Sequence, residues 1–155
     1  MDFLLDNTDL RILQLMQDNA RISNADLARE LEMAPSAVLE RVKKLEQKKV
    51  IQQYNTSINP NAVNQKLLAF IFIKTKEVAS ETKISASLAK IPEVQEVHVI
   101  AGEDCFLVKV RTEDSASLMA LMRQRIKSIP DVISTKTTIV LETMKEQQQL
   151  VIPKD

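Results

Sequence analysis

A short internal repeat constrains the second half of this chain more than any other feature. The segments Ile91-Pro92-Glu93-Val94 and Ile129-Pro130-Asp131-Val132 each follow a helical pattern of apolar residues and precede a strand-like run. Each helix ends at its proline, because proline lacks an N–H and its ring clashes with the preceding turn. The repeat therefore predicts two strand–helix–strand units. Two such units form a ferredoxin-like βαββαβ domain, so the predicted fold class is α+β.

The strand-like runs of this domain span residues 67–75, 94–101, 105–112 and 132–142. Both helices of such a domain cover one face of the sheet, which leaves the other face open. Residues 67–73 are apolar at both parities. Four more apolar residues are expected on the open face: Val97, Val99, Phe106 and Val108. We therefore expect this face to be buried against another subunit, with residues 149–152 as an added edge strand that Pro153 stops.

The first half of the chain has the start signals of three short helices. Asp6 and Asp9 are spaced as an N-cap and N3 pair before the first helix, and Ser23 with Asp26 repeats this spacing before the second. Pro35 suits the first turn of the third helix. A short helix, a tight turn and a second helix that starts polar and becomes basic are typical of a helix-turn-helix, whose last helix enters the major groove of DNA.

The third helix is predicted to bury one narrow stripe, formed by Val38, Val42 and Leu45. Residues 41–55 hold five basic side chains against one acidic, whereas residues 1–40 hold three against eight. Basic charge therefore gathers on this helix, and double-stranded DNA is the expected partner. The predicted DNA-binding residues are Ser36, Glu40, Arg41, Lys43, Lys44, Gln47 and Lys48. The lysines suit phosphates, the other polar residues suit base edges, and Arg41 either reaches a phosphate or braces the helix.

Turn-forming residues separate the two halves. Residues 50–54 are predicted as a strand, and 55–65 as a linker, since Asn and Pro replace the periodic pattern there. The predicted domains are 1–54 for DNA binding, 55–65 as linker and 66–155 for oligomerisation and effector binding. The longest apolar run, 67–73, is far short of the roughly 20 residues that a membrane span needs. Without a leader-like N-terminus, the expected location is the cytoplasm, with no membrane partner.

Metal and covalent chemistry are not expected. Cys105 is the only cysteine and His98 the only histidine, so no disulfide forms within the chain and no cluster has the spacing of zinc ligands. We interpret His98 as a strand residue and Cys105 as a small core residue. No cofactor, metal site or catalytic residue is predicted.

Over essentially its whole length the chain resembles the Lrp/AsnC, or feast/famine, family of regulators. The resemblance rests on LDNTDLRIL (5–13), NARIS (19–23), LA (27–28), PSAVLERVKKLE (35–46), VIQQY (50–54) and Gly102 with FLVK (106–109). It implies a winged helix-turn-helix, dimers joined through their sheets, higher assemblies such as octamers, and amino acids as effectors.

The chain departs from the family mainly where the family has glycine. Glu32, Lys49 and Asn64 stand at such positions, and a left-handed backbone at a non-glycine residue costs about 1 kcal/mol. Ala34 replaces the usual serine N-cap of the recognition helix, which removes roughly 0.5 to 2 kcal/mol. Cys105 replaces an acid that is common in the family.

An amino-acid effector needs acceptors for its ammonium, donors for its carboxylate and a pocket for its side chain. The turn between the middle strands and two threonines of the last strand, from the same or a neighbouring subunit, can supply these groups. The predicted effector-binding residues are Ala101, Gly102, Glu103, Asp104, Thr137 and Thr138. Apolar surroundings and Cys105 favour an uncharged effector such as leucine or methionine. A plain hairpin tip with two solvated acids is the competing interpretation.

Two other functions stay open. Some siroheme decarboxylases resemble this family in domain order, but their substrate carries many carboxylates, and the second half of this chain offers a single histidine. The other alternative is a DNA-binding protein or interaction module that senses nothing. We therefore predict a sequence-specific transcription regulator, and not an enzyme.

Overall fold

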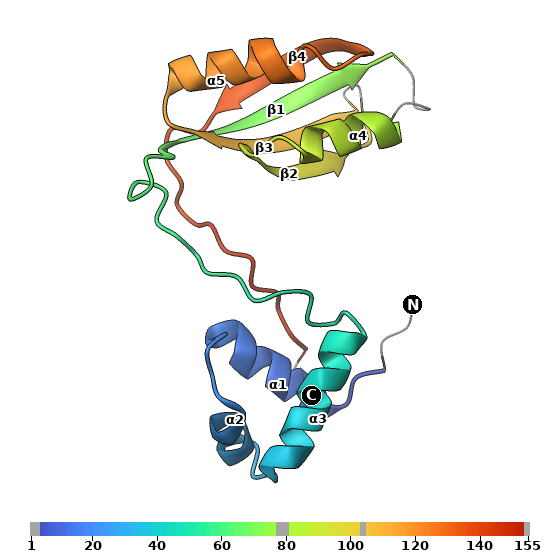
Figure 1. Ribbon diagram of the computed structural model, residues 1–155, viewed down its shortest axis with the longest axis vertical. Helices are drawn as coiled ribbons and strands as arrows, with labels where there is room; N and C mark the ends of the chain where they lie inside the picture. Colours follow the sequence, from blue (N-terminus) through green and yellow to red (C-terminus); the bar gives the residue numbers. More distant parts are fainter. Residues whose placement is uncertain (1–3, 77–80, 103–104, 154–155) are drawn as a thin grey trace. The chain divides into compact units, whose positions relative to one another are not determined.

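The computed structural model describes residues 4–76, 81–102 and 105–153, and it divides the chain into two compact units (Figure 1). Unit 1 comprises Met1–Ser57 with Glu146–Asp155, and unit 2 comprises Ile58–Lys145. The division at residues 57 and 58 falls inside the segment expected to link two domains. No helix among the described residues is long and apolar enough to cross a membrane.

Unit 1 contains the helices α1 (Asn7–Asp18), α2 (Asn24–Glu30) and α3 (Pro35–Gln47). Asp6 and Asp9 form a capping box on α1, and the Ser23 side chain accepts the Asp26 N–H at the start of α2, as the sequence predicts. Ala34 precedes α3 without a side-chain cap. The core of the unit is formed by Ile12, Leu27, Ala28, Val38, Val42 and Leu45.

Glu32 and Lys49 end α2 and α3 with a left-handed backbone, at φ 52° and 59°. Each lies in a Schellman motif, in which two N–H groups close back onto the helix. The Lys49 N–H donates to the Glu46 carbonyl and the Val50 N–H to the Leu45 carbonyl, both at 2.9 Å. The turns thus keep the geometry that glycine would favour, at a cost of about 1 kcal/mol each.

The predicted strand at 50–54 is wrong for the described chain, where these residues form no strand. The N–H groups of Val50 and Ile51 both donate to the Leu45 carbonyl, so they complete the end of α3. Their side chains pack on the core of unit 1. The strand-like pattern marks this packing, and a strand also needs a hydrogen-bonded neighbour, which no described segment supplies.

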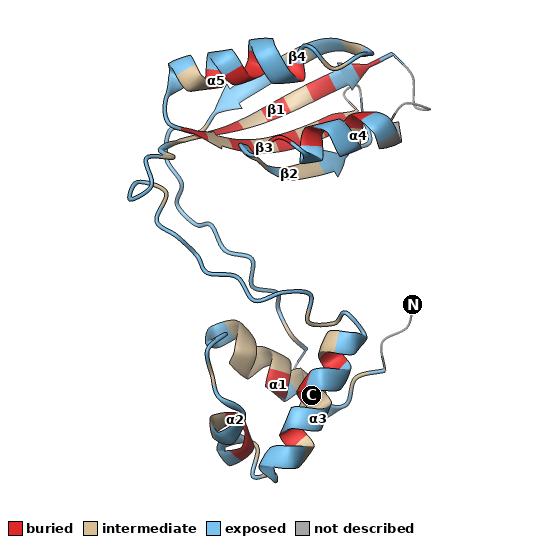
Figure 2. Cartoon of the chain, in the orientation of Figure 1, coloured by how far each residue is buried: buried red, intermediate tan, exposed pale blue. Residues whose placement is uncertain are grey.

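Unit 2 holds β1 (Leu67–Thr75), α4 (Glu81–Ala89), β2 (Val94–Val99), β3 (Phe106–Thr112), α5 (Ser115–Leu121), η2 (Met122–Ile126) and β4 (Val132–Ile139). The described strands form an antiparallel sheet in the order β2-β3-β1-β4. The helices cover one face of the sheet, and β1 and β3 are its most buried strands (Figure 2). The second helix widens into a π-helical turn, η2, before its proline. The predicted βαββαβ order is confirmed.

The prediction assigned the wrong set of alternating side chains to the open face. Val97, Phe106 and Val108 pack in the core against the helices, and Val99 pairs with Phe106 on that same side. The open face instead carries the alternate residues, among them Phe70, Phe72 and Leu107. The bounds of β1 agree with the prediction, whereas the other three strands are shorter than predicted: β2 ends at Val99, β3 begins at Phe106 and β4 ends at Ile139.

Residues 149–152 form no strand within the described chain, and their pairing across a subunit interface stays a prediction. They belong to unit 1, where Gln149 and Leu150 form hydrogen bonds with Gln17 of α1. An extended segment can satisfy its backbone through a side-chain amide as well as through a sheet edge, and here the side chain of Gln17 takes that place.

Candidate nucleic-acid interface and effector site

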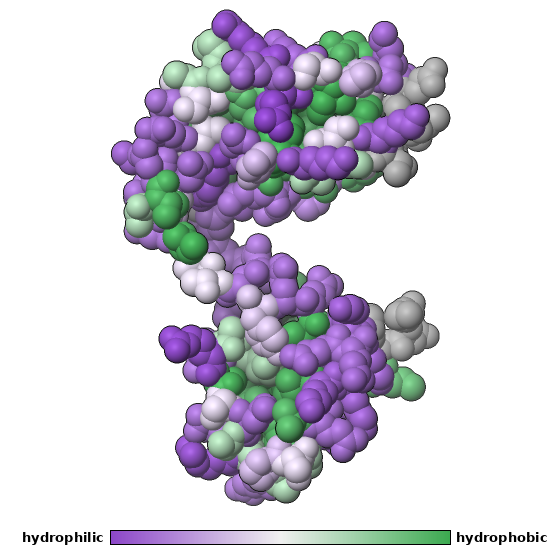
Figure 3. Space-filling view, in the orientation of Figure 1, coloured by the Kyte–Doolittle hydropathy of each residue, from purple (hydrophilic) through white to green (hydrophobic). Residues whose placement is uncertain are grey.

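Helix α3 presents a polar surface because its apolar residues are confined to one stripe. Val38, Val42 and Leu45 are buried in unit 1. The predicted base-reading and phosphate-binding side chains are exposed: Ser36, Glu40, Lys43, Lys44, Gln47 and Lys48. Figure 3 shows a mainly hydrophilic surface over α3 with apolar atoms beside it. An exposed, partly basic helix on a three-helix core is the arrangement that docks in the major groove.

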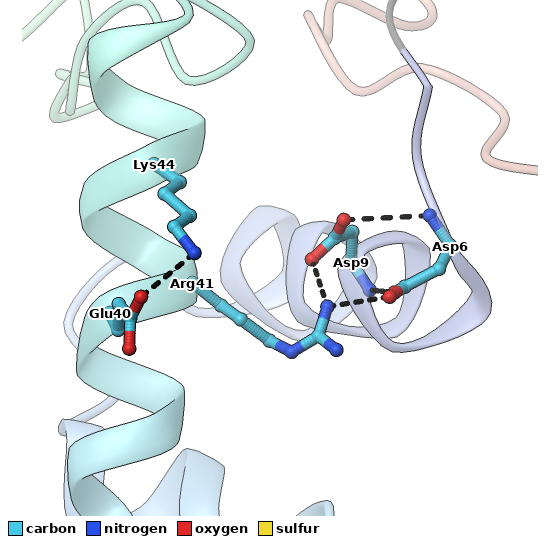
Figure 4. A network of polar contacts seen from close by, with 5 residues as sticks. All are labelled: Asp6, Asp9, Glu40, Arg41 and Lys44. Carbon is cyan, nitrogen blue, oxygen red and sulfur yellow. Dashed lines mark hydrogen bonds and ion pairs between the residues drawn. The ribbon is translucent and has the colours of Figure 1, made fainter.

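Arg41 is directed toward α1 and not toward solvent (Figure 4). Its guanidinium lies 2.7 Å from the Asp6 carboxylate and 2.8 Å from that of Asp9. The hydrogen bond from the Asp9 N–H, followed by that from Arg41, lowers the pKa of Asp6. Both acids also cap α1, so this network joins the start of α1 to the middle of α3. Of the two roles considered for Arg41, the geometry favours bracing the helix.

The lysines of α3 differ in their partners. Lys44 forms an ion pair with Glu40 at 2.8 Å, and the bond lowers the pKa of Glu40. Lys43 and Lys48 form no ion pair with the part of the chain that the structure describes. Lys44 and Lys48 line a depression of about 360 Å³ beside Arg41. Lys43 and Lys48 are therefore the lysines whose charge is most available to phosphates.

Tyr54 also belongs to this site, although it was predicted only as part of a strand. Its hydroxyl donates to Glu46 of α3 at 2.8 Å. Burial, and then this hydrogen bond, raise the pKa of Tyr54 to about 12. The phenol is thus protonated at neutral pH and fastens the start of the linker to the recognition helix. Glu46 lies in α3 and Tyr54 lies beyond its end, so no single helical or strand period relates the two residues.

The predicted effector residues are only partly brought together. Ala101 and Gly102 are exposed, and Gly102 has φ 145° with no heavy atom within 4 Å of where a Cβ would lie. Glu103 and Asp104 lie outside the described residues. Thr137 and Thr138 point to opposite faces of β4, because side chains alternate along a strand. The Thr137 hydroxyl contacts the Met122 sulfur at 3.9 Å on the helix side.

The register also separates the threonines from the turn. Cys105 donates its N–H to the Ile73 carbonyl, and Ile73 pairs with Thr135 of β4. Thr137 lies two residues further along β4, about 7 Å away along the strand. Within one chain the structure therefore does not join these threonines to the turn, and the alternative in which they come from a neighbouring subunit fits the register better.

Charged side chains surround the apolar centre of the open sheet face. Glu96 binds His98 at 3.1 Å and Lys109 at 3.2 Å, and the pKa of Glu96 is lowered first by His98 and then by Lys109. Lys136 lies 6.0 Å from the centre of the Phe72 ring. No group of three potential metal ligands occurs among the described residues.

A helix-turn-helix unit joined to a ferredoxin-like unit defines a two-domain class of DNA-binding regulators. The family model of the winged helix-turn-helix DNA-binding domain matches residues 5–52, and that of the Lrp/AsnC ligand binding domain matches residues 68–150. The chain belongs to the Lrp/AsnC family of transcription regulators. The predicted family and fold are thereby confirmed.

The relatives of the chain agree with it over nearly their full length. The leucine-responsive regulatory proteins of Salmonella typhimurium and Escherichia coli K12 are 33% identical over 150 residues, which is 96% of this chain and 92% of each relative. A transcriptional regulator of Neisseria meningitidis in complex with L-Met is 30% identical, with a TM-score of 0.88 over 96% of this chain and 97% of its own. AsnC of E. coli is 27% identical, with a TM-score of 0.87 over 97% of this chain and 100% of its own.

Proposed function

We propose that this transcription regulator binds its DNA sites through the exposed face of α3 and responds to a small uncharged amino acid bound by unit 2. DNA contact by α3 is supported by one observation: the helix has an exposed polar face and is held in place by ion pairs to α1. Lys43 and Lys48 carry unpaired charge among the described residues, while Arg41 holds the helix against the capping acids of α1. Lysines then supply the phosphate contacts, and Ser36 and Gln47 read base edges.

Replacing Lys43 and Lys48 together by alanine should weaken binding to every DNA sequence. Each lost phosphate contact reduces the magnitude of the slope of log K against log salt by about 0.9. The slope of the double variant should therefore be smaller in magnitude by about 2 per subunit. The measurement is fluorescence anisotropy of a labelled duplex across a salt series. Lys90→Ala, which removes an exposed charge from unit 2, is the matched control. An unchanged slope in the double variant would show that α3 is not the phosphate-binding helix.

The proposed effector site lies at the turn around Gly102 and is completed by a neighbouring subunit. Gly102 leaves its backbone open to a ligand, since the nearest atoms leave room where a side chain would stand. Cys105, beside the turn, stands where a carboxylate could have bound a basic effector. Its thiol therefore favours an effector with an uncharged side chain. The L-Met bound to the regulator of N. meningitidis supports an amino acid of this kind.

A thermal-shift series against the amino acids tests this part. A ligand that binds only the folded state stabilises it by about 2.7 kcal/mol at a hundredfold excess over its Kd, so L-leucine or L-methionine should raise the melting temperature. L-lysine and L-arginine should not. Gly102→Ala, which strains the backbone at φ 145° and places a methyl group in the open space, should abolish the shift. Stabilisation by a basic amino acid alone would contradict the proposed specificity.

The further parts of the proposal concern assembly and mode of action. Dimers form through the open sheet face and combine into a larger assembly such as an octamer, so that two α3 helices reach two half-sites. The protein acts by binding in the cytoplasm, where the DNA is, and not by catalysis. Mixing the purified protein with siroheme and recording its absorbance tests the enzymatic alternative, because we expect no spectral change.

A further inference from the structure

The segment that follows β4 returns to the DNA-binding unit, where it forms hydrogen bonds with Gln17 of α1. Gln17, in the last turn of α1, donates from its side-chain amide to the Leu150 carbonyl at 3.0 Å and accepts the Leu150 N–H at 2.8 Å. Gln149 donates from its own side chain to the Gln17 carbonyl at 2.9 Å. Three hydrogen bonds thus join residues that lie more than 130 positions apart in the sequence.

At Leu150 this contact recognises the backbone and not the side chain. The amide of Gln17 pairs with both the donor and the acceptor of Leu150, as the edge of a sheet would. The side chains of Leu150 and Val151 remain 77% and 99% exposed. The Gln17 carbonyl is among the last four of α1, which have no partner within the helix, and Gln149 satisfies it. The contact therefore has a defined geometry, and its exposed hydrogen bonds make it easy to open.

The chain passes between its two units twice, first after α3 and again after β4. The first passage is fixed on α3 by Tyr54. The second is fixed on α1 by Gln17. We propose that Gln17 is the docking site for the segment 149–150, and that this docking is a second connection through which the state of unit 2 is transmitted to the helix-turn-helix. The transmission rests on the proposed function; the docking does not.

Amide hydrogen exchange of the full-length protein tests the docking without DNA or effector. The Leu150 N–H should exchange about tenfold or more slowly than that of Val151, because only the first is hydrogen-bonded. Gln17→Ala should remove this protection, and so should Gln149→Ala in part. Gln148→Ala, an exposed neighbour, is the matched control and should retain it. Equal exchange at residues 150 and 151 in the parent protein would overturn the docking.

The transmission is tested with a duplex that the parent protein has selected from random DNA. Saturating L-methionine or L-leucine should change the Kd of the parent and of Gln148→Ala by about fivefold or more. In Gln17→Ala the change should fall below about twofold, while the thermal shift by the same amino acid and the Kd without it stay as in the parent. A full response in Gln17→Ala would overturn the transmission. If the parent protein bound no DNA, or did not respond to the amino acid, the proposed function and the transmission would both be overturned. The docking would then be judged by the hydrogen-exchange experiment alone.

Discussion

Individual residues in this chain adopt a backbone conformation that their side chains disfavour. Glu32, Lys49 and Asn64 have φ between 52° and 59°, and Asp131 has φ 70°. Asn and Asp tolerate this region because their short side chains form local hydrogen bonds, whereas Glu and Lys gain no such relief. Helices α2 and α3 nevertheless end there, because the Schellman hydrogen bonds and the packing of Val50 outweigh a cost of about 1 kcal/mol.

Replacing Glu32 or Lys49 by glycine should therefore stabilise unit 1. Each substitution relieves about 1 kcal/mol of backbone strain. Part of this gain is offset because glycine raises the conformational entropy of the unfolded chain, so the melting temperature should rise by a few degrees. Differential scanning calorimetry measures the change. Lys43→Gly, at an exposed position inside α3, is the control and should destabilise by about 1 kcal/mol. A lower melting temperature for Lys49→Gly would mean that the turn is not strained.

At the scale of elements, α1 and α3 are held together by polar groups as well as by the core. Asp6 caps α1, and Arg41 of α3 binds both acids of the capping box. The cap alone is worth about 0.5 to 2 kcal/mol in proteins. The position of the recognition helix therefore depends on charges at the start of a different helix.

The charge of Asp6 should give the protein an acid-dependent stability. Its pKa is lowered below the ordinary value of 3.8, so its stabilising effect is complete above that pH and is lost as the pH falls through the folded-state pKa. Asp6→Asn keeps a capping side chain but removes the charge, and it should be less stable than the parent at pH 7 by less than about 1 kcal/mol. Urea titrations should show this difference disappearing as the pH falls below 3.8 and through the lowered folded-state pKa of Asp6.

A double-mutant cycle identifies the partner of Asp6. In an Arg41→Gln background the Asp6→Asn substitution should cost less, because the ion pair is already absent. Costs that simply add would show that Arg41 does not stabilise the charge of Asp6. Arg41→Gln should also weaken binding to all DNA sequences through the mounting of α3, and not through a lost phosphate contact, so the salt slope should remain that of the parent.

The elements themselves were largely predictable, because caps, prolines and apolar periods are local signals. The capping box at Asp6, the stripe on α3 and the repeated proline motif each predicted an element that the structure contains. The failures concern partners far along the chain. Arg41 lies 32 and 35 residues from its acids, and Gln17 lies 133 residues from Leu150. The prediction of which strand residues face the helices was wrong for the same reason, since it depends on the pairing between β1 and β3.

At the scale of the whole molecule, the open sheet face is an apolar surface that no described helix covers. Phe70 and Phe72 of β1 and Leu107 of β3 lie on the side that no described helix covers. Ion pairs involving Glu96 and Lys109 border them. An apolar centre with a charged rim is typical of an interface between subunits, and a two-fold pairing would bring two such faces together.

The protein should accordingly have a mass of at least twice 17.5 kDa at micromolar concentration, measured by light scattering coupled to size exclusion. Phe72→Glu should shift the mass to that of the monomer, because it buries a charge in the interface, while the circular dichroism spectrum stays unchanged since Phe72 is outside the core. Met119→Glu, at an exposed apolar position on α5, should leave at least a dimer. The monomeric variant should also lose tight DNA binding although α3 is intact, because a single helix-turn-helix reaches one half-site only. A parent protein that is monomeric would contradict the dimer and, with it, the two-half-site mode of DNA recognition.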